Sequence, residues 1–258
     1  MEINSKYYYN VGEKGSGYIW KNTVNKKEIF LKKIKGGLIV SCQARKGWPM
    51  YGSNIMAAFA KAAEEGGAVG IRATGKDDIS AIKKHVNLPI IGINKRFSDY
   101  PVYITPTYES AKEILDIGID IIALDCTERL RPNDEHYVDI INEIKKNYPN
   151  ILIMAEVSNI EEAKKVLFSC DIDLISTTLS GYTEESKPIV SVDIELIKNI
   201  KKISDIPIIA EGKVNDAKDA INAIMAGAYA VVIGTSITRP EIITSRIVEN
   251  IKRYGNES

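Results

Sequence analysis

The stretch LPIIGINKR, residues 88–96, represents a unit that repeats along this chain. It starts as an apolar run through Ile90 and Ile91 and ends in two cations, Lys95 and Arg96. A short run that is apolar on both faces is typical of a strand in a buried parallel sheet. A charged residue at the end of such a run is expected where the strand leaves the core.

Eight runs of this kind occur, and helical segments separate them. The apolar runs are residues 37–43 (GLIVSCQ), 68–73, 88–95, 120–125, 151–156, 173–177, 206–212 and 229–234. The segments with helical period are residues 53–67, 76–86, 107–118, 134–147, 158–169, 191–204 and 214–228, followed by a last helix that begins at Pro240. Several of these segments open with Ser, Asp or Asn, which favour helix N-termini.

Eight strands alternating with eight helices in 258 residues predict a single-domain (β/α)8 TIM barrel. A doubly wound open sheet is the alternative fold. It would need a glycine-rich first turn for a dinucleotide, and residues 41–47 (SCQARKG) lack that pattern.

The first 36 residues stand apart from this alternation. We expect the barrel to occupy residues 37–258 and residues 1–36 to form an N-terminal extension. Within it, residues 25–37 (NKKEIFLKKIKGG) predict a short amphipathic helix, which could close the bottom of the barrel. The aromatic segments KYYYN and GYIW could instead form an interaction arm.

Composition narrows the class of protein. Lys+Arg and Asp+Glu both total 34, which argues against nucleic acid or a membrane surface as the main partner. Three widely spaced cysteines without CxxC spacing favour a reduced, cytoplasmic protein over a disulfide framework or a zinc site. The two histidines, His85 and His136, lie in charged helical segments and are expected on the surface. Proton transfer would therefore fall to Lys, Glu or Asp.

Polar residues end the predicted strands, where the active sites of barrels lie. Together they predict one ring of mixed charge: Gln43, Arg72, Lys95, Asp125, Glu156, Thr177, Thr178, Glu211, Gly234 and Thr235.

Half of this ring is suited to a phosphate group. The loops after the seventh and eighth strands contain Gly212, Lys213, Gly234 and Thr235, and barrels commonly bind phosphate there through backbone N–H groups. Arg239 could add a charge-assisted contact.

The other half carries acid–base candidates. Burial and nearby cations would lower the pKa of Lys95, whereas carboxylates would raise it, and a lowered value would make the neutral amine available as a base. A structural ion pair is the alternative role for Lys95. Cys42 and Cys126 are interpreted as packing residues. Tyr182 could cover a ligand or pack a loop.

These strings in this order resemble the N-acetylmannosamine-6-phosphate 2-epimerase family. The resemblance rests on SCQA (41–44), GIRA (70–73), LPIIGINKR (88–96), STTLSGYT (176–183), AEGKVN (210–215) and SITRP (236–240) and covers roughly residues 36–250. It implies a phosphosugar barrel of bacterial sialic acid catabolism that interconverts N-acetylmannosamine 6-phosphate and N-acetylglucosamine 6-phosphate. The family needs neither a metal nor a nicotinamide cofactor, and a homodimer is suggested.

The resemblance also implies roles for individual residues. Lys95 matches the family's acid–base lysine and Glu211 its glutamate. Gln43 and Arg72 match residues that hold the sugar, and Arg239 matches the arginine on the phosphate side. We further expect Asp125, Glu156, Thr178 and Tyr182 to bind the sugar, with Gly212, Lys213, Gly234 and Thr235 at the phosphate. Whether one base or two serve the two faces of C2 stays open.

The sequence departs from the family pattern in three places. Glu156 stands in MAEVS (154–158) where the family has Asp. Residues 45–54 (RKGWPMYGSN) place Met50 and Tyr51 where the family typically has Leu-His. The N-terminal extension is also longer. Two other functions therefore stay open: a Schiff-base aldolase or lyase acting through Lys95, and a phosphosugar-binding barrel without catalysis.

Overall fold

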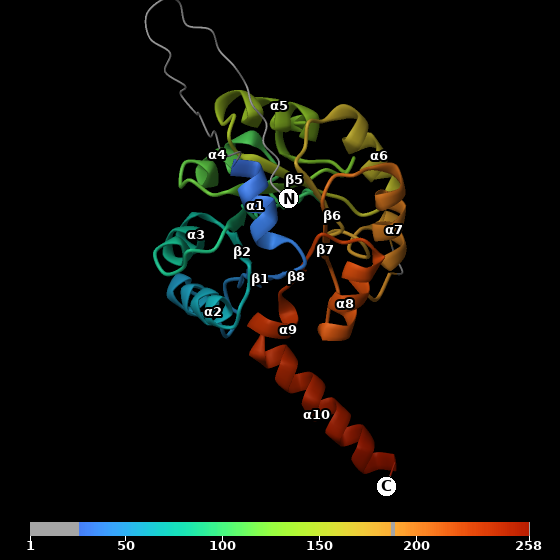
Figure 1. Cartoon of the computed structure of the whole chain (residues 1–258). Coiled ribbons are helices and arrows are strands. Elements are labelled where there is room, and N and C mark those ends of the chain that lie inside the picture. Colours follow the sequence, from blue (N-terminus) through green and yellow to red (C-terminus); the bar gives the residue numbers. More distant parts are fainter. Residues whose placement is uncertain (1–25, 187–188, 258) are drawn as a thin grey trace, which may run out of the picture.

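The computed structural model describes residues 26–186 and 189–257 and contains a closed barrel of eight parallel strands (Figure 1). Each strand pairs with the next in the sequence, and β8 pairs with β1 to close the sheet. The strands are β1 (Leu38–Cys42), β2 (Gly70–Thr74), β3 (Ile90–Ile93), β4 (Ile121–Asp125), β5 (Leu152–Glu156), β6 (Leu174–Ser176), β7 (Ile208–Glu211) and β8 (Ala230–Ile233). The predicted (β/α)8 fold is confirmed.

Helices follow the strands and surround the barrel (Figure 1). They are α1 (Lys26–Ile34), α2 (Ser53–Glu65), α3 (Lys76–Lys83), α4 (Tyr108–Leu115), α5 (Tyr137–Asn147), α6 (Ile160–Ser169), α7 (Ile194–Ile203), α8 (Ala217–Ala226), α9 (Thr235–Thr238) and α10 (Pro240–Glu257). Helices α6, α7 and α8 begin after Asn159, Asp193 and Asp216. The side chain of each of these residues accepts a hydrogen bond from the backbone N–H three residues later.

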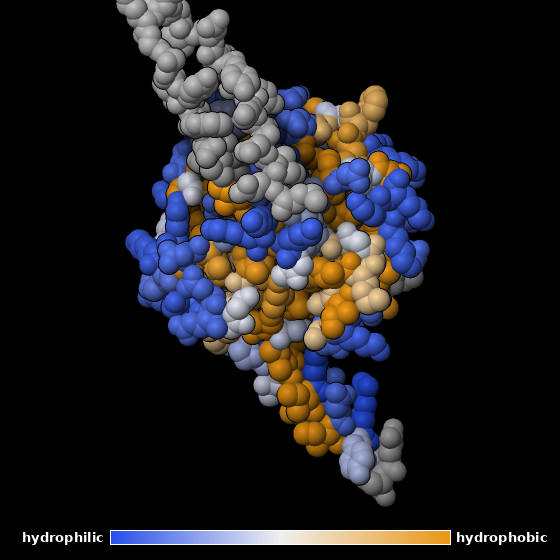
Figure 2. Space-filling view, in the orientation of Figure 1, coloured by the Kyte–Doolittle hydropathy of each residue, from blue (hydrophilic) through white to orange (hydrophobic). Residues whose placement is uncertain are grey.

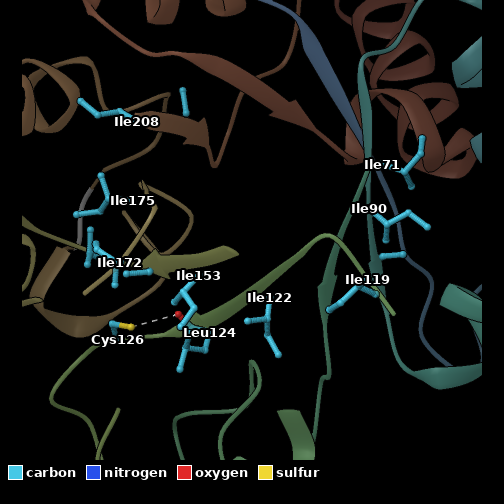
Figure 3. Packing of buried hydrophobic residues seen from close by; sticks show 14 of the residues in the cluster. Ile71, Ile90, Ile119, Ile122, Leu124, Cys126, Ile153, Ile172, Ile175 and Ile208 are labelled. Carbon is cyan, nitrogen blue, oxygen red and sulfur yellow. Dashed lines mark hydrogen bonds between the residues drawn. The ribbon is translucent and has the colours of Figure 1, made fainter. Parts of the chain in front are cut away.

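Two apolar layers separate the inside of the barrel from the outside. One lies between strands and helices, and Figure 3 shows part of it, with Ile71, Ile90, Ile122 and Ile153 pointing toward the helices. The other fills the barrel interior and takes the alternate strand residues, Ile91 and Ile93 on β3 among them. Because successive side chains of a strand point to opposite faces, polar residues nearer the C-terminal ends of the strands also point into the barrel. They are Ser41, Arg72, Asp125, Glu156 and Glu211.

The predicted amphipathic helix is present as α1. Its Phe30 and Ile34 are buried with the barrel interior, and Gly36 donates its N–H to Tyr229 O at the start of β8. Helix α1 therefore closes the N-terminal end of the barrel, as expected. Residues 1–25, with the aromatic segments proposed as an interaction arm, lie outside the described residues.

Helix α10 behaves differently from the other barrel helices. It leaves the barrel and extends away from it (Figure 1), and a column of apolar side chains runs along it (Figure 2). Ile247 is 55% and Ile251 66% exposed. The nearby α8 also leaves Ile221 and Met225 exposed. The last helix thus leaves a large apolar face uncovered.

Candidate active site

A cavity of about 620 Å³ opens at the C-terminal end of the barrel. The loops after β1, β3, β6, β7 and β8 line it, together with Arg72 from within β2. Eleven residues expected in the site contribute to its wall: Gln43, Arg72, Lys95, Thr178, Tyr182, Glu211, Gly212, Lys213, Gly234, Thr235 and Arg239. The polar ring predicted from the strand ends is therefore largely one continuous surface.

Lys95 is held by a short hairpin that follows β3. Its backbone forms an antiparallel bridge with Ile104, Arg96 N–H donates to Tyr103 O, and the Lys95 N–H donates to Thr74 Oγ1 at 3.1 Å. Desolvation, reinforced by the positive charge of Arg72, lowers the pKa of Lys95 to about 8. Roughly a tenth of Lys95 is thus the neutral amine at pH 7, and the fraction rises steeply toward pH 8.

Arg72 is buried at the base of the cavity between two carboxylates. Its Nη1 lies 3.0 Å from Glu211 Oε1 and its Nη2 2.5 Å from Glu156 Oε1. Arg72 Nε and Glu156 Oε2 are buried and have no hydrogen-bond partner within the described part of the chain. The two ion pairs therefore hold the guanidinium in a fixed position, where Arg72 lines the base of the cavity.

Glu211 lies at the end of β7 and faces Arg72, Lys95 and Thr178. Thr178 Oγ1 donates to Glu211 Oε2 at 3.2 Å, and the Glu211 N–H donates to Thr177 Oγ1. Burial raises the pKa of Glu211 to about 7, assisted by the negative charge of Glu156 and opposed by Arg72 and Lys95. Glu211 can thus exist as acid or carboxylate near neutral pH, beside an amine with a lowered pKa.

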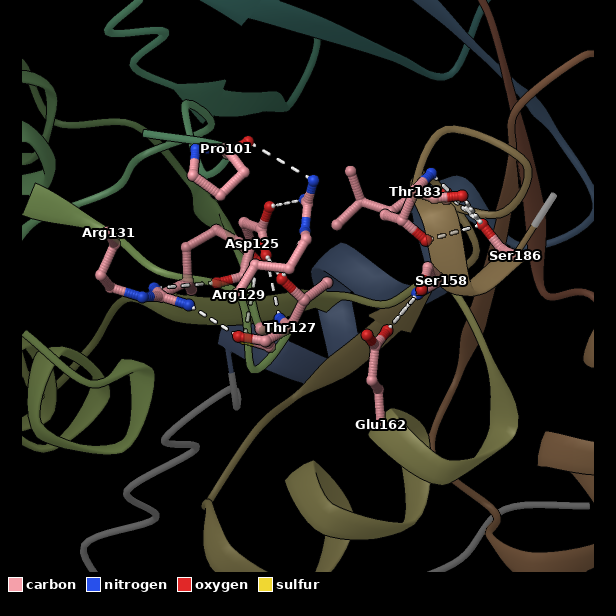
Figure 4. Close-up of polar contacts among 12 residues, drawn as sticks. Pro101, Asp125, Thr127, Arg129, Arg131, Ser158, Glu162, Thr183 and Ser186 are labelled. Carbon is pink, nitrogen blue, oxygen red and sulfur yellow. Dashed lines mark hydrogen bonds and ion pairs between the residues drawn. The ribbon is translucent and has the colours of Figure 1, made fainter. Parts of the chain in front are cut away.

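Asp125 and Glu156 lie behind the cavity wall. Asp125 accepts from Thr127 N–H and from the Thr127 hydroxyl, and its Oδ2 pairs with Arg129 at 2.6 Å (Figure 4). Its own N–H donates to Ile104 O, and Ile104 lines the cavity in its place. Asp125 thus organises the loop after β4, while Glu156 reaches the site through Arg72.

This arrangement brings together an amine and a carboxyl group that titrate near neutral pH, and a fixed guanidinium. Such a set can remove a proton from carbon, return one, and stabilise the oxyanion formed between the two steps.

The family model described as "Putative N-acetylmannosamine-6-phosphate epimerase" matches residues 56–253. This chain belongs to that epimerase family. The match extends from α2 through most of α10 and includes Arg72, Lys95, Glu211 and Arg239.

Individual relatives agree with this membership in the epimerase family. Over 232 residues, the chain is 49% identical to a protein of Caldanaerobacter subterraneus subsp. tengcongensis named "Putative N-acetylmannosamine-6-phosphate 2-epimerase", with 88% of this chain and 96% of the relative covered. A relative with the same name from Clostridioides difficile is 47% identical over 223 residues, covering 86% of this chain and 99% of the relative.

A solved structure of an N-acetylmannosamine-6-phosphate 2-epimerase from Clostridium perfringens shares the fold. It is 42% identical and superimposes with a TM-score of 0.81, covering 91% of this chain and 99% of that chain. The barrel of this family is thus retained over nearly its whole length.

In the loop after β7 of this epimerase-family barrel, two residues adopt left-handed backbone conformations. Gly212 has φ +107° and Lys213 φ +56°. Lys213 Nζ donates to the Ser180 and Gly181 carbonyls and lies 4.0 Å from the centre of the Tyr182 ring. A left-handed backbone at a residue other than glycine, as at Lys213, is strained, and such strain is common at functional sites. The contacts of Lys213 connect the loop after β7 to the loop after β6, with Tyr182 at the cavity wall.

Among the lining residues that sequence reasoning missed, four have charged or aromatic side chains: Arg45, Trp48, Tyr103 and Arg246. Arg45 and Trp48 belong to the loop after β1, where this chain departs from the family pattern, and that departure was the available signal. Tyr103 lies on the hairpin after β3, and Arg246 lies two turns into α10, so neither ends a strand.

The cysteines and histidines lie away from the cavity of this family member. Cys42 and Cys126 are fully buried, and burial raises the pKa of Cys42 to about 12 and that of Cys126 well above its usual range. Both are packing residues, as interpreted from the sequence. His85 and His136 are exposed, as expected.

Within residues 26–186 and 189–257, no group of three or more His, Cys, Asp and Glu side chains is arranged to hold a metal ion. No helix in this part of the chain is long and apolar enough to cross a membrane.

Proposed function

We propose that this chain epimerises C2 of N-acetylmannosamine 6-phosphate to give N-acetylglucosamine 6-phosphate. The observation that carries the proposal is the juxtaposition of Lys95, Arg72 and Glu211 in one cavity, with the pKa of Lys95 lowered to about 8 and that of Glu211 raised to about 7. The names of its relatives support the choice of substrate.

The chemistry follows from the acidity of C2 in the open-chain sugar. Once the ring opens, C1 is an aldehyde, and the C2 hydrogen next to it can be removed as a proton. Neutral Lys95 takes this proton and leaves an enolate, whose oxygen the Arg72 guanidinium stabilises. A proton then returns to the opposite face of C2, from Lys95 in a one-base scheme or from Glu211 in a two-base scheme. No cofactor is required.

The sugar and the phosphate are assigned to opposite halves of the cavity. Gln43, Thr178 and Tyr182, which line the cavity, hold the sugar. The phosphate group is assigned to the loops after β7 and β8, through Gly212, Lys213, Gly234, Thr235 and Arg239. Asp125 and Glu156 support the sugar site through the neighbours they hold.

Proton exchange at C2 tests this function. The purified protein is incubated in D₂O with N-acetylmannosamine 6-phosphate, and loss of the C2 proton signal is followed by NMR. We expect exchange in the wild type and a reduction of about 10²- to 10⁴-fold in Lys95→Ala, the usual contribution of a general base. Lys46→Ala, an exposed lysine outside the cavity wall, serves as the control.

Two results would contradict the proposal. Absence of exchange in the folded wild type would argue for a binding protein, and undiminished exchange in a folded Lys95→Ala would show that another group is the base. The family of relatives does not favour the Schiff-base lyase or the binding protein.

We also propose that the protein is a cytoplasmic homodimer. The apolar face of α10, with Ile247, Val248 and Ile251 exposed, needs a partner surface, and a second copy of the chain provides one wherever the protein is present. The three cysteines are free thiols, which fits a reducing compartment.

A further inference from the structure

A row of stacked cations and rings runs along the mouth of the cavity and joins three loops. The Arg239 guanidinium carbon lies 3.6 Å from the centre of the Trp48 ring, and that of Arg45 lies 5.4 Å from it. Arg45 also lies 4.6 Å from the centre of Phe97, which stacks on Tyr103 with 5.1 Å between ring centres. We call these five residues, Arg239, Trp48, Arg45, Phe97 and Tyr103, the Trp48 stack.

Arg239 is fixed by two contacts. Its Nε–H donates to Glu241 Oε1 at 2.7 Å, and its planar group lies at van der Waals distance over Trp48. No hydrogen bond from the described residues engages its two terminal nitrogens. A guanidinium held at Nε and on one face presents those nitrogens together, which is the geometry of bidentate phosphate binding.

Arg45 is held by rings alone. Within residues 26–186 and 189–257, no carboxylate pairs with Arg45, although its side chain lines the cavity and its charge contributes to lowering the pKa of Lys95. An arginine without a carboxylate partner ordinarily retains its rotamer freedom, and aromatic faces on Trp48 and Phe97 restrict it here. Two cations that would repel each other thus both lie against the Trp48 ring on the same cavity wall, and Phe97 contacts Arg45 from a second side.

We propose that Trp48 is a positioning residue that holds Arg45 and Arg239 as a pair of phosphate-binding cations. The inference rests on the proposed function and deepens it, because it adds Arg45 to the phosphate site and gives a role to the loop in which this chain departs from its family. Stacking of Trp48 on the sugar ring is the competing role. A guanidinium already covers the indole at 3.6 Å, which favours the positioning role.

The experiment measures phosphate binding separately from turnover. Inorganic phosphate is titrated calorimetrically into the wild type, Trp48→Ala, Trp48→Phe and Arg45→Ala, with Lys46→Ala as the matched control for loss of a cation from the same loop. We expect Trp48→Ala and Arg45→Ala to weaken phosphate binding about fivefold to tenfold, Trp48→Phe to recover most of the loss, and Lys46→Ala to bind as the wild type does.

Steady-state kinetics on N-acetylmannosamine 6-phosphate provide the second readout. We expect the KM of Trp48→Ala to rise by a factor similar to that for inorganic phosphate, with kcat nearly unchanged, because the reacting atoms lie at Lys95 and not at the stack. Circular dichroism establishes that each variant is folded, and Trp48→Phe tests the ring if Trp48→Ala does not fold.

Two outcomes would overturn the inference. A raised KM in Trp48→Ala or Trp48→Phe with unchanged affinity for inorganic phosphate would place Trp48 against the sugar. Equal weakening of phosphate binding in Arg45→Ala and Lys46→Ala would show that the effect comes from the total positive charge of the loop and not from the position of Arg45. By contrast, a wild type that binds inorganic phosphate with the expected pattern among the variants but does not exchange C2 hydrogen would refute the proposed function and leave the Trp48 stack standing.

Discussion

Lys95 owes its chemistry to the strand that precedes it. The apolar residues of β3 anchor the chain in the core, and the bridge to Ile104 stops the lysine from turning toward solvent. The amine is then desolvated beside Arg72, and both effects disfavour its charged form. A flexible lysine on an open loop would keep a pKa near its ordinary value and would be a poor base at neutral pH.

The pH dependence of activity follows from the sign of this shift. The proposed base is neutral Lys95, so kcat/KM should rise with pH and level off above an apparent pKa of about 8. Because the charge of Arg45 helps to lower that pKa, Arg45→Gln should move the same limb to higher pH, whatever its effect on affinity. Measuring kcat/KM from pH 5.5 to 10 checks both expectations.

The alkaline side of the same profile separates the two proton-return schemes. If Glu211 must donate a proton, the active form has neutral Lys95 and protonated Glu211, so activity should stay level between the two pKa values of about 7 and about 8 and fall at higher pH. If Lys95 returns the proton itself, the plateau persists. A profile without an acidic limb between pH 6 and 9 would rule out Lys95 as the titrating base.

Residue by residue, the sequence predicted which side chains gather but not which of them face the cavity. Asp125 and Glu156 end their strands as Glu211 does, yet Arg129 and Arg72 hold them behind the wall. The end of a predicted strand indicates where a side chain lies along the barrel axis. Which cation a carboxylate pairs with depends on segments that are far apart in the sequence. The Trp48 stack was missed for the same reason, since it joins the loops after β1, β3 and β8.

At the scale of elements, β3 shows how tightly the strand and helix layers fit. A Cβ at Gly92 would lie 2.6 Å from Ile119 Cδ1 and 3.2 Å from its Cγ2, so the absence of a side chain makes room for the segment before β4. Since β3 pairs with both β2 and β4, the strand that positions Lys95 depends on this fit.

Gly92→Ala should therefore destabilise the protein by about 1–3 kcal/mol through overpacking. Ile119→Val removes the methyl group that would clash, and the double variant should lose less stability than the sum of the two single variants, by about 1 kcal/mol. Denaturant unfolding of the four proteins measures this coupling. As a control, Gly92→Ala combined with Ile153→Val should be additive within about 0.5 kcal/mol, and additivity in the Ile119 pair would contradict the clash.

The elements themselves were well predicted because their signals are local. Seven of the eight apolar runs contain an observed strand, the run 68–73 contains all of β2 except Thr74, and the periodic segments contain α2 to α8. The differences arise where local signals are weak. Arg72 lies within β2 and not at its end, because pairing with β3 extends the strand to Thr74, and the single turn α9 was not predicted from four residues.

For the whole molecule, the sequence predicted a closed barrel but not the course of α10. Its helical period and Pro240 mark where a helix begins and say nothing about which surface it packs against. If the exposed face of α10 is covered by a second copy, aspartate in that face should separate the copies. We expect Ile247→Asp/Ile251→Asp to shift the protein from dimer to monomer.

Light scattering coupled to size-exclusion chromatography measures this shift. Arg253→Asp places the same new charge on the opposite side of α10 and should leave the dimer intact. A wild type that is monomeric at all concentrations, or loss of the dimer in both variants alike, would contradict the proposed interface.

The pairing of β1 with β8 has a consequence for synthesis on the ribosome. Leu38 pairs with Val231, so the edge of β1 stays unpaired until nearly the whole chain has been translated, and a nascent strand edge can recruit other chains. The same closure unites Trp48, which follows β1, with Arg239, which follows β8. The pairing of β1 with β8, late in translation, therefore both covers the exposed strand edge and completes the proposed phosphate site.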